Sequence, residues 1–513
     1  MAVKDNFTGF LKYAVVPTLL WTLCLLLVGI PSAADEPALP KGLEPMPAAS
    51  EPSLPQGLEP AEPALPIGLE SDEPGLPEGL GSAEPGLPEG LGSAEPALPA
   101  GLEISNASTE TDTESTAVKT PPFVLHGFWD TRAGTRVQSD SAQVKDATLG
   151  ESRLQLKTDK DWDNLFAEFT ADGVFDAVEE RAKLDIRQLR LTWTPIDALD
   201  IRIGRQVLTW GTGDMLFIND LFPKDWVSFF SGRNEEYLKA PSNTLRIGWF
   251  NEWMNVELAY SPRFDPDRHI TGKRFSYYSP LHGRTVGRAN RTRADKPDHF
   301  FDDDEIALRL YRNIGSAQLA FYGYSGFWKS PGGMQLIPMR SVFPKLNVYG
   351  ASLRGTVGRG IGNIEVGYYD SRDDRRGRKA LINNSEFRML LGYEREIAKE
   401  LTLGLQYYLE YMMRYSAYRD TLPFFMTARD RDRHVTTVRL TKLLMNQNLI
   451  LSLFAYFSPS DSDAYLRPNI TYKISDTLTV ETGGNIFLGA HKDTFFGQFE
   501  DNTNIYAGFR VSF

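Results

Sequence analysis

The sequence predicts an all-β fold, a transmembrane antiparallel β-barrel of about 18 strands (16 is the alternative) over residues 121–513, preceded by a disordered proline-rich tail. Three observations predict it: short segments in which apolar and polar residues alternate, connections that alternate between long and short, and an alternating apolar segment that ends at Phe513. A hydrophobic content of 42% excludes a wholly disordered chain, and a mean hydropathy of −0.32 argues against a bundle of transmembrane helices.

Residues 1–34 are typical of a secretory signal peptide. Lys4 and Lys12 form the positive flank, an apolar run follows, and small residues at its end suit cleavage after Ala34. Because the apolar run is long for a signal, an uncleaved inner-membrane anchor is the alternative. Cys24 lies in this run and is the single cysteine of the chain. Because one cysteine has no partner, the sequence excludes an intrachain disulfide and a cysteine-based metal site.

Residues 35–103 repeat the pattern E-P-x-L-P-x-G-L, with five copies spaced by eleven residues from Glu51 onward. This segment holds fourteen acidic side chains and one lysine, a net charge of −13, although the whole chain carries only −12. Proline and glycine disfavour regular structure, so we expect an extended, disordered tail. It is either a solvated linker or a periplasmic tether to the cell wall or a periplasmic protein, and residues 104–120 form a second linker.

From residue 121 onward the apolar and polar side chains alternate with the period of a β-strand. In residues 401–411, for example, leucine and tyrosine occupy every odd position. The predicted strands cover residues 123–138, 147–158, 163–173, 182–194, 199–210, 242–250, 252–261, 304–312, 315–326, 346–357, 361–371, 384–395, 400–413, 432–442, 447–457, 463–474, 477–489 and 502–513.

The connections between these strands are sorted by length. Those after odd-numbered strands are mostly long, as in 211–241 and 262–303, whereas those after even-numbered strands are short, as in 313–314. This sorting predicts a transmembrane barrel with periplasmic turns, long external loops and both termini in the periplasm. Barrel closure also pairs every backbone group within the membrane.

The last strand places five apolar residues on one face, and these are Ile505, Ala507, Phe509, Val511 and Phe513. The segment resembles the C-terminal signature of bacterial outer-membrane proteins, which implies recognition by the barrel-assembly machinery. With the signal peptide and the sorted loops, residues 121–513 resemble Gram-negative outer-membrane porins. The strand number is nearer to the large substrate-specific and alginate-export-like porins. The resemblance implies a place in the cell outer membrane, with the tail in the periplasm and contact with outer-membrane lipid and lipopolysaccharide.

If the apolar faces meet lipid, the opposite faces line the interior. An arginine at mid-depth on the lipid face would cost roughly 2–4 kcal/mol, so we assign the strand arginines to the lumen. The alternation slips between Ile186 and Leu189 and again near Arg205, so bulges are expected there and the facing of Arg187 and Arg205 stays open. The predicted pore-lining basic residues are Arg132, Arg136, Arg153, Arg187, Arg190, Arg202 and Arg205.

The connection 211–241 is too apolar for a loop in water. It follows the fifth strand, and the resemblance to porins therefore implies a loop that folds inward and narrows the channel. By that resemblance Asp214, Asp220 and Asp225 would face the arginines of the first five strands, and opposed charges across a constriction select charged solutes. A lid packed over the barrel mouth is the alternative.

Two further charged segments suggest binding. The basic connection 262–303 suits lipopolysaccharide phosphates or anionic solutes, and a solvated loop is equally favoured. Residues 302–305 are all acidic and could hold a divalent cation, although a charge cluster at the start of a strand is the favoured interpretation.

The sequence contains no catalytic motif. Its six histidines lack ligand spacing, and the G-x-S-x-G, H-E-x-x-H and P-loop patterns are absent. We therefore expect no enzyme, no cofactor, no metal and no nucleic-acid partner. The hypothesis is a porin that forms a water-filled channel for passive diffusion of small hydrophilic, anionic solutes. The alternatives are a barrel that anchors a periplasmic tether and a channel for polysaccharide export.

Overall fold

The computed structural model describes residues 124–291 and 293–513. The predicted signal peptide (1–34), repeat tail (35–103) and linker (104–120) lie outside the described residues.

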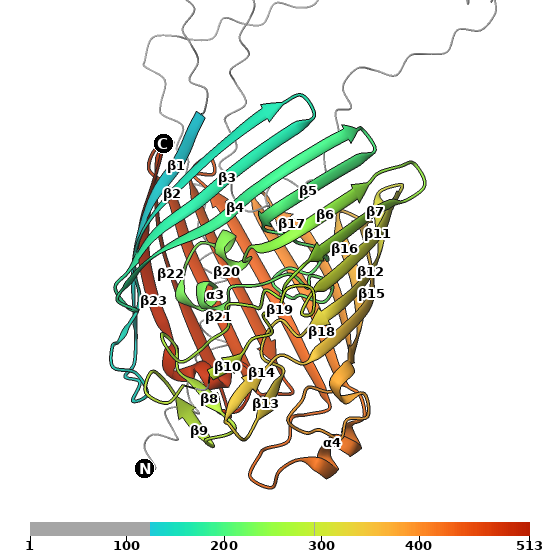
Figure 1. Ribbon diagram of the computed structural model, residues 1–513. Coiled ribbons are helices and arrows are strands. Elements are labelled where there is room, and N and C mark those ends of the chain that lie inside the picture. Colours follow the sequence, from blue (N-terminus) through green and yellow to red (C-terminus); the bar gives the residue numbers. More distant parts are fainter. Residues whose placement is uncertain (1–123, 292) are drawn as a thin grey trace, which may run out of the picture. The chain divides into compact units, whose positions relative to one another are not determined.

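Eighteen strands form one antiparallel sheet, in which each strand pairs with the next barrel strand along the chain (Figure 1). This confirms the predicted all-β fold with 18 strands instead of 16. The barrel strands are β1 (Val124–Arg136), β2 (Ala147–Trp162), β3 (Leu165–Asp176), β4 (Arg181–Ile196), β5 (Leu199–Gln206), β6 (Ser242–Trp249), β7 (Asn255–Ser261), β11 (Glu305–Ile314), β12 (Ala317–Phe327), β15 (Lys345–Val357), β16 (Gly360–Ser371), β17 (Glu386–Ala398), β18 (Leu401–Met412), β19 (Asp432–Leu444), β20 (Leu449–Ser458), β21 (Asp463–Lys473), β22 (Leu478–Gly489) and β23 (Asn504–Ser512).

The sheet closes on itself because β23 also pairs with β1. Beyond the end of that ladder, Gly127 and Phe513 exchange backbone hydrogen bonds of 2.9 and 3.0 Å. Gly127 needs to be glycine, since a Cβ there would lie 2.3 Å from the carbonyl oxygen of Gln155 and 2.9 Å from the Phe513 ring. Closure leaves no free sheet edge among the barrel strands.

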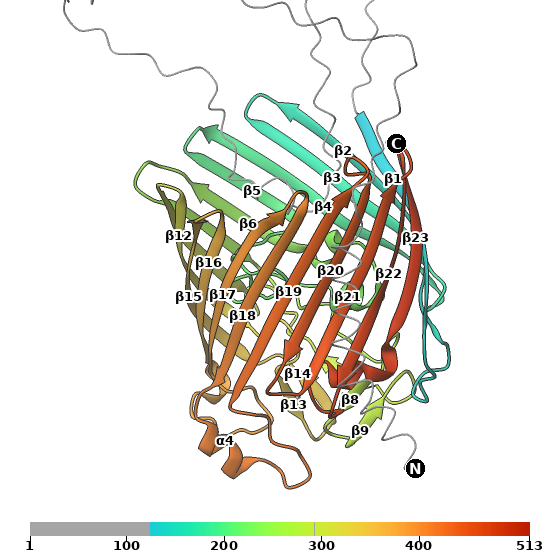
Figure 2. The same cartoon turned by 180° about the vertical axis from the view of Figure 1, so that it is seen from behind.

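The connections are sorted by length at the two ends of the barrel, as predicted, except that 177–180 and 459–462 at the loop end hold only four residues each. The turns after even-numbered members of the ring hold two to five residues, and the left-handed conformation that tight turns need is supplied by Gly315 (φ 57°) and Gly358 (φ 61°). Figures 1 and 2 show these turns at the top and the long loops at the bottom. The loops carry the short elements α3 (Trp226–Ser231), η2 (Glu235–Leu238), β8 (Tyr277–Ser279), β9 (Arg284–Val286), β10 (Arg293–Asp295), β13 (Gly333–Gln335), β14 (Arg340–Val342), η3 (Arg372–Asp374), α4 (Tyr415–Thr421) and η4 (Gly497–Asn502).

Most apolar strand side chains point outward, and the charged side chains of the strands point mainly inward, where they are joined by the aromatic residues that pack against a loop. On β2, Leu154 is 44% exposed, whereas its neighbour Arg153 is 4% exposed. On β18, Leu405 is 45% exposed and Gln406 is 8% exposed. The outer surface is therefore an apolar band, and the charged groups lie inside.

A bulge changes the facing of β4. The ladder between β3 and β4 shifts register between Thr170 and Ala171, which leaves Arg187 without a directly opposite residue. Leu184 is exposed before the shift and Leu189 after it, so the outward positions change from even to odd. The slip predicted between Ile186 and Leu189 is thus confirmed. Within the described part of the chain, no helix is both long and apolar enough to cross a membrane.

Candidate functional site

The connection between β5 and β6, residues 207–241, is called the β5–β6 loop. It carries α3 and η2, and Figure 1 shows this green segment between the front and back strands. Its apolar side chains pack against inward-facing aromatic residues, and each buried aromatic side chain contributes roughly 1.5–3 kcal/mol to folding. The buried loop residues are Met215, Ile218, Phe222, Phe229, Phe230 and Leu238, and the strand aromatics include Tyr324, Tyr369, Tyr408, Tyr456, Tyr465 and Phe487. This packing accounts for the unusually apolar composition of the loop.

One end of the loop is held by the carboxylate of Glu365 on β16. This fully buried side chain accepts backbone N–H bonds from Thr212 (2.8 Å), Gly213 (3.1 Å) and Asn219 (2.7 Å). The hydroxyl of Thr212 donates a fourth bond of 3.0 Å to the same carboxylate. The Glu365 carboxylate therefore takes the place of water as the acceptor for these loop N–H groups, which are not paired in a β-ladder.

The same end of the loop carries Asp214, which forms a two-bond ion pair with Arg439 on β19, at 2.5 and 2.9 Å. Glu235 of η2 lies 3.8 Å from Arg439 and 3.6 Å from Arg467 on β21. The two guanidinium groups are also placed over aromatic rings, at 4.7 Å from Phe454 and 4.6 Å from Phe229 respectively. Two loop carboxylates thus face two wall arginines.

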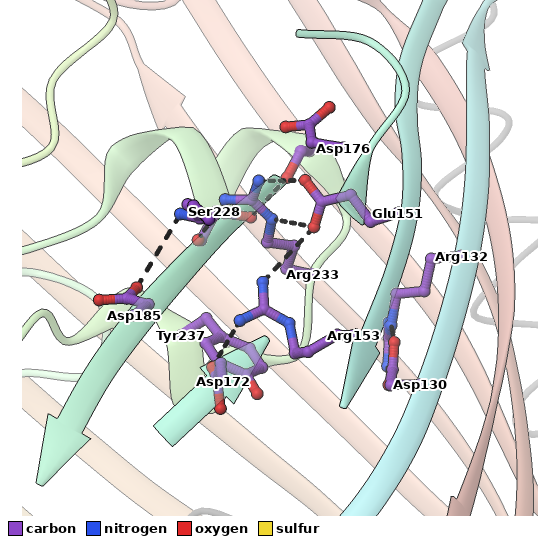
Figure 3. Close-up of polar contacts among 12 residues, drawn as sticks. Asp130, Arg132, Glu151, Arg153, Asp172, Asp176, Asp185, Ser228, Arg233 and Tyr237 are labelled. Atoms are coloured by element: carbon purple, nitrogen blue, oxygen red, sulfur yellow. Dashed lines mark hydrogen bonds and ion pairs between the residues drawn. The ribbon is translucent and has the colours of Figure 1, made fainter. Parts of the chain in front are cut away.

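The other end of the loop is held by Glu151 on β2 (Figure 3). Arg233, which follows α3, donates from Nε to Glu151 at 2.8 Å and makes a second bond through Nη2. Arg274, from the connection between β7 and β11 (residues 262–304, the β7–β11 loop), lies 3.1 Å from the same carboxylate, and Arg153 lies 3.4 Å from it. One buried carboxylate therefore joins the barrel wall to two loops.

Tyr237 of η2 lies between two arginines of the wall. The guanidinium of Arg153 is 4.0 Å from the ring centre, and that of Arg187 is 4.5 Å from it. Arg187 also donates 2.9 Å to the carbonyl of Glu236. Burial raises the pKa of Tyr237 above its ordinary value, more than the nearby Arg153 lowers it, so the ring stays neutral between two cations.

Beside this group, Arg132 on β1 bonds to Asp130 at 2.8 Å, to Glu481 at 2.8 Å and to the carbonyl of Gly232 at 3.0 Å. Arg510 on β23 lies 3.1 Å from Asp130 and 2.7 Å from Glu236 of the loop. Strands β1, β2, β4 and β23 thus all contact the part of the loop after α3.

The predicted wall arginines lie in three different settings. Arg132, Arg153 and Arg187 are buried against the loop, as described above. Arg136, at the loop end of β1, is buried and bonds to the side chain of Asn502 and to the carbonyl of Lys145. Arg190 and Arg202 lie nearer the short turns, are partly exposed, and pair with Glu168 and Asp200 at 2.8 and 2.9 Å.

Arg205 does not share the face of Arg202. In the ladder it lies opposite Leu189 on β4 and Asn243 on β6, both of which are exposed, and its Nε donates to the carbonyl of Ile186. By register Arg205 shares the face of Ile203 at the end of β5, and its place among the pore-lining residues stays a prediction. The preceding Gly204 has φ 128°, a conformation that the sequence pattern did not indicate.

The expected partners of the three loop aspartates differ from those observed. Asp214 pairs with Arg439, Asp220 with Lys224 at 2.9 Å, and Asp225 with Arg268 at 3.3 Å. None of these partners, among the residues that the structure describes, belongs to the first five strands. Asp225 instead caps α3, because its carboxylate accepts the N–H of Ser228 at 2.7 Å.

Wall and loop differ in which charge they expose. In two wall pairs near the short turns the cation is the more exposed partner, with Arg190 at 22% against 10% for Glu168, and Arg202 at 21% against 16% for Asp200, whereas in the pair of Arg132 with Glu481 the carboxylate is the more exposed partner, at 14% against 6%. In the pairs between loop and wall the carboxylate is the more exposed partner, with Asp214 at 38% against 16% for Arg439. The pairs of Arg190 and Arg202 thus expose more of the cation, and the pair of Asp214 exposes more of the loop carboxylate.

Sequence reasoning missed Glu151, Arg233, Tyr237 and Glu235. The alternation of β2 puts Glu151 on the face of Arg153, which was a usable signal. No pattern in the sequence indicates Arg233, since its partner lies 82 residues away. Within residues 124–291 and 293–513, no group of three His, Cys, Asp or Glu side chains could hold a metal ion.

No protein-family model matches the chain, and no curated protein sequence matches it. Among solved structures, OccAB3 of Acinetobacter baumannii is 10% identical, covers 76% of this chain and 99% of that chain, and has a TM-score of 0.47. OccD3 (OpdP) of Pseudomonas aeruginosa is 9% identical over 76% of this chain and 91% of that chain, with a TM-score of 0.46. A loop-deletion mutant of OmpT, an outer membrane protein of Vibrio cholerae, is 11% identical over 77% of this chain and 100% of that chain, with a TM-score of 0.38. These likenesses are distant, and the barrel is established by its own strand ladder.

Proposed function

We propose that the chain is an outer-membrane porin, a water-filled channel for passive diffusion of small hydrophilic, anionic solutes that is narrowed by the β5–β6 loop. The observation that carries the proposal is the closed 18-stranded ladder with an apolar outer band and charged inner faces. A water-soluble barrel gains nothing from an apolar exterior, whereas a bilayer requires it.

The contacts of the β5–β6 loop support its role as the constriction. Its residues bond to inward-facing side chains of β16, β18 and β19 near one end and of β1, β2 and β4 near the other. Of the three predicted aspartates, Asp214 pairs with a strand arginine and is itself 38% exposed, and we add Glu235, which is 50% exposed, to the proposed constriction. Asp220 and Asp225 serve the internal structure of the loop.

The difference in exposure between wall and loop supports the anion clause. A solute that passes the wall meets Arg190 and Arg202 before it meets their carboxylate partners. The loop carboxylates Asp214 and Glu235 carry the opposite charge, and charges of both signs along a narrow lumen orient charged solutes. Arg132, Arg153 and Arg187 are covered by the loop, so we assign them a positioning role.

The experiment is a swelling assay of liposomes that contain the purified chain. Anionic, neutral and cationic solutes of similar size are compared at equal osmolarity. We expect the anionic solute to enter fastest. Entry of none of the solutes would overturn the channel, and fastest entry of the cation would overturn the anion clause.

The remaining parts of the hypothesis concern assembly and the tail. On β23, Ile505 and Phe509 are exposed on the outer face, and Phe513 follows at the end, which fits a C-terminal assembly signature. The tether alternative depends on residues 36–103, outside the described residues. The chain is proposed to act without catalysis.

A further inference from the structure

The β7–β11 loop crosses the mouth of the barrel at the loop end. It leaves β7, the seventh strand of the ring, and contacts β1, β2 and η4, each at least five strands away around the 18-stranded sheet. Figures 1 and 2 both show β8 and β9, which belong to this loop, beside the loop end of β22 and β23. A segment that connects walls so far apart spans the lumen. We call residues 262–291 of this loop the strap.

The far end of the strap is fixed by Arg274, whose side chain is buried. Its guanidinium donates to the carbonyl of Thr148 at 2.6 Å, lies 3.1 Å from Glu151 on β2, and pairs with Asp176 at the end of β3. Its own carbonyl accepts a bond from the guanidinium of Arg136 on β1. The carboxylates compensate a buried cation here, so loss of the guanidinium would leave buried negative charge undercompensated.

A second contact lies two residues further along the strap. The backbone N–H of Ser276 donates to the side-chain oxygen of Asn502 in η4 at 3.1 Å, and the side-chain amide of Asn502 donates back to the carbonyl of Ser276 at 2.9 Å. Both residues are buried, and so is Phe275, whose ring joins the apolar cluster of the β5–β6 loop. Residues 274–276 are therefore docked against the wall formed by β1, β2 and η4.

The near part of the strap lies directly on the β5–β6 loop. The carboxylate of Asp267 accepts the backbone N–H of Lys224 at 2.7 Å and the indole N–H of Trp226 at 3.0 Å. Arg268 pairs with Asp225 of the loop at 3.3 Å and with Asp185 on β4 at 2.6 Å. Figure 1 shows α3 deeper in the barrel than β8 and β9, so a solute that arrives from the loop end meets the strap first.

The strap and the wall on which it docks carry opposite charges. Residues 268–291 include six lysine or arginine residues and no aspartate or glutamate. The wall presents Glu151, Asp176 and also Glu179, which lies 3.9 Å from Arg274. Water can replace ion pairs and hydrogen bonds when they separate, at a small net cost for most of them. A contact of this kind therefore suits a segment that docks and lifts repeatedly.

We propose that the strap is a gate over this mouth and that Arg274 is its latch. The channel is closed while the Arg274 guanidinium lies between Glu151 and Asp176, and it opens when the strap lifts from β1, β2 and η4. The β5–β6 loop stays in place on β16 through Glu365, so that loop still sets the width of the open channel. The inference rests on the proposed channel function and goes beyond it, because it assigns the moving part.

The first test is planar-bilayer recording of the full-length chain, which measures the ratio of open to closed time. Arg274→Gln removes the cation from a buried ion pair, which weakens the docked state far more than the loss of a surface pair would. We therefore expect the ratio of open to closed time to rise at least about tenfold. The control is Arg284→Gln, which removes the same charge from an exposed position on the strap and should match the wild type.

A disulfide supplies the second test. The Ser276 hydroxyl lies 3.1 Å from the side-chain amide of Asn502, so Ser276→Cys/Asn502→Cys brings two thiols together. The background is Cys24→Ser, which removes the single cysteine of the chain. We expect oxidation of the double variant to abolish conductance and a reductant to restore it, with mass spectrometry to confirm the disulfide. The two single cysteine variants should not respond to the oxidant.

The two tests separate the gate from the channel. An equal ratio of open to closed time in Arg274→Gln and Arg284→Gln would overturn the latch. Unchanged conductance after the disulfide has formed would overturn the gate, and both results would leave the proposed channel standing. Absence of conductance from the wild type and from every variant would contradict the proposed function instead, provided that the heat-dependent gel shift of a folded barrel shows that each protein has folded.

Discussion

At the scale of single residues, Glu151 joins three separate parts of the chain. It is buried, and three guanidinium groups from β2, the β5–β6 loop and the β7–β11 loop surround it. A buried ion pair adds little net stability when complete, but removal of one partner leaves charges that neither water nor protein satisfies.

We therefore predict that Glu151→Gln loosens both loops and lowers the free energy of unfolding by about 3–5 kcal/mol. Urea unfolding in vesicles measures the change, and protease cleavage within 207–241 reports the loop directly. Glu180→Gln is the control, because Glu180 pairs with Lys145 on the surface and its substitution should leave the stability close to that of the wild type. Equal effects of the two substitutions would contradict the assigned role.

Asp225 gives the β5–β6 loop a dependence on pH. Burial alone would raise the pKa of this carboxyl, but Arg268, Arg233 and the N–H of Ser228 outweigh burial and hold the pKa below its ordinary 3.8. A lowered pKa stabilises the folded loop above pH 3.8, and that contribution is lost as the pH falls through the folded value. We expect protease resistance of the loop to be constant from neutral pH to about pH 5 and to fall below about pH 4. Asp225→Asn should be less resistant at neutral pH and lose this acid-dependent step, and an unchanged step in that variant would exclude Asp225 as its source.

At the scale of elements, the strands could be predicted and the loop contacts could not. Strand positions follow from the two-residue period of apolar side chains, because a bilayer requires an apolar outer face on every strand. The predicted strand 182–194 corresponds to β4, and the slip in its alternation indicated the bulge that the structure shows. By register Arg205 shares the face of Ile203, and the irregularity expected near it appears as the positive φ of Gly204, with no shift in the ladder to β6. The partners of Asp214 and Arg233 lie 225 and 82 residues away, and only the closed barrel brings them together.

The β5–β6 loop is fixed to β16 through one carboxylate, so Glu365→Gln is a sharp test of its placement. The glutamine amide keeps the size of the side chain, but its NH₂ group would face backbone N–H donors of the loop. At least one hydrogen bond to the loop is then lost, which lowers the free energy of unfolding by about 1–3 kcal/mol. We expect the loop to fluctuate, which single-channel recording would detect as added current noise relative to the wild type. Glu394→Gln, which neutralises a carboxyl on the neighbouring strand β17, is the control. A quiet Glu365→Gln channel would contradict the anchoring role.

At the scale of the whole molecule, the chain charge of −12 says little about transport. The segment 35–103 accounts for −13, and residues 104–513 are neutral overall. Inside the barrel, arginines and carboxylates are largely paired, so selectivity depends on which partner of each pair is exposed. Arg190 and Arg202 are more exposed than their wall partners, and Asp214 of the loop is more exposed than Arg439.

This arrangement predicts opposite effects of wall and loop substitutions on ion preference. Arg190→Gln/Arg202→Gln should shift the reversal potential in a salt gradient toward cations, whereas Glu235→Gln should shift it toward anions. Both sets of residues are partly exposed, so folding should be preserved, and the gel shift of the barrel checks this. Shifts of the same sign for both variants would contradict the charge arrangement.

The most direct test of the central claim is planar-bilayer recording of the purified chain across a potassium chloride gradient. The proposed function predicts discrete conductance steps and a reversal potential on the anion side. Absence of steps at every voltage and salt concentration, with the protein shown to be inserted, would contradict the claim that this barrel is a channel.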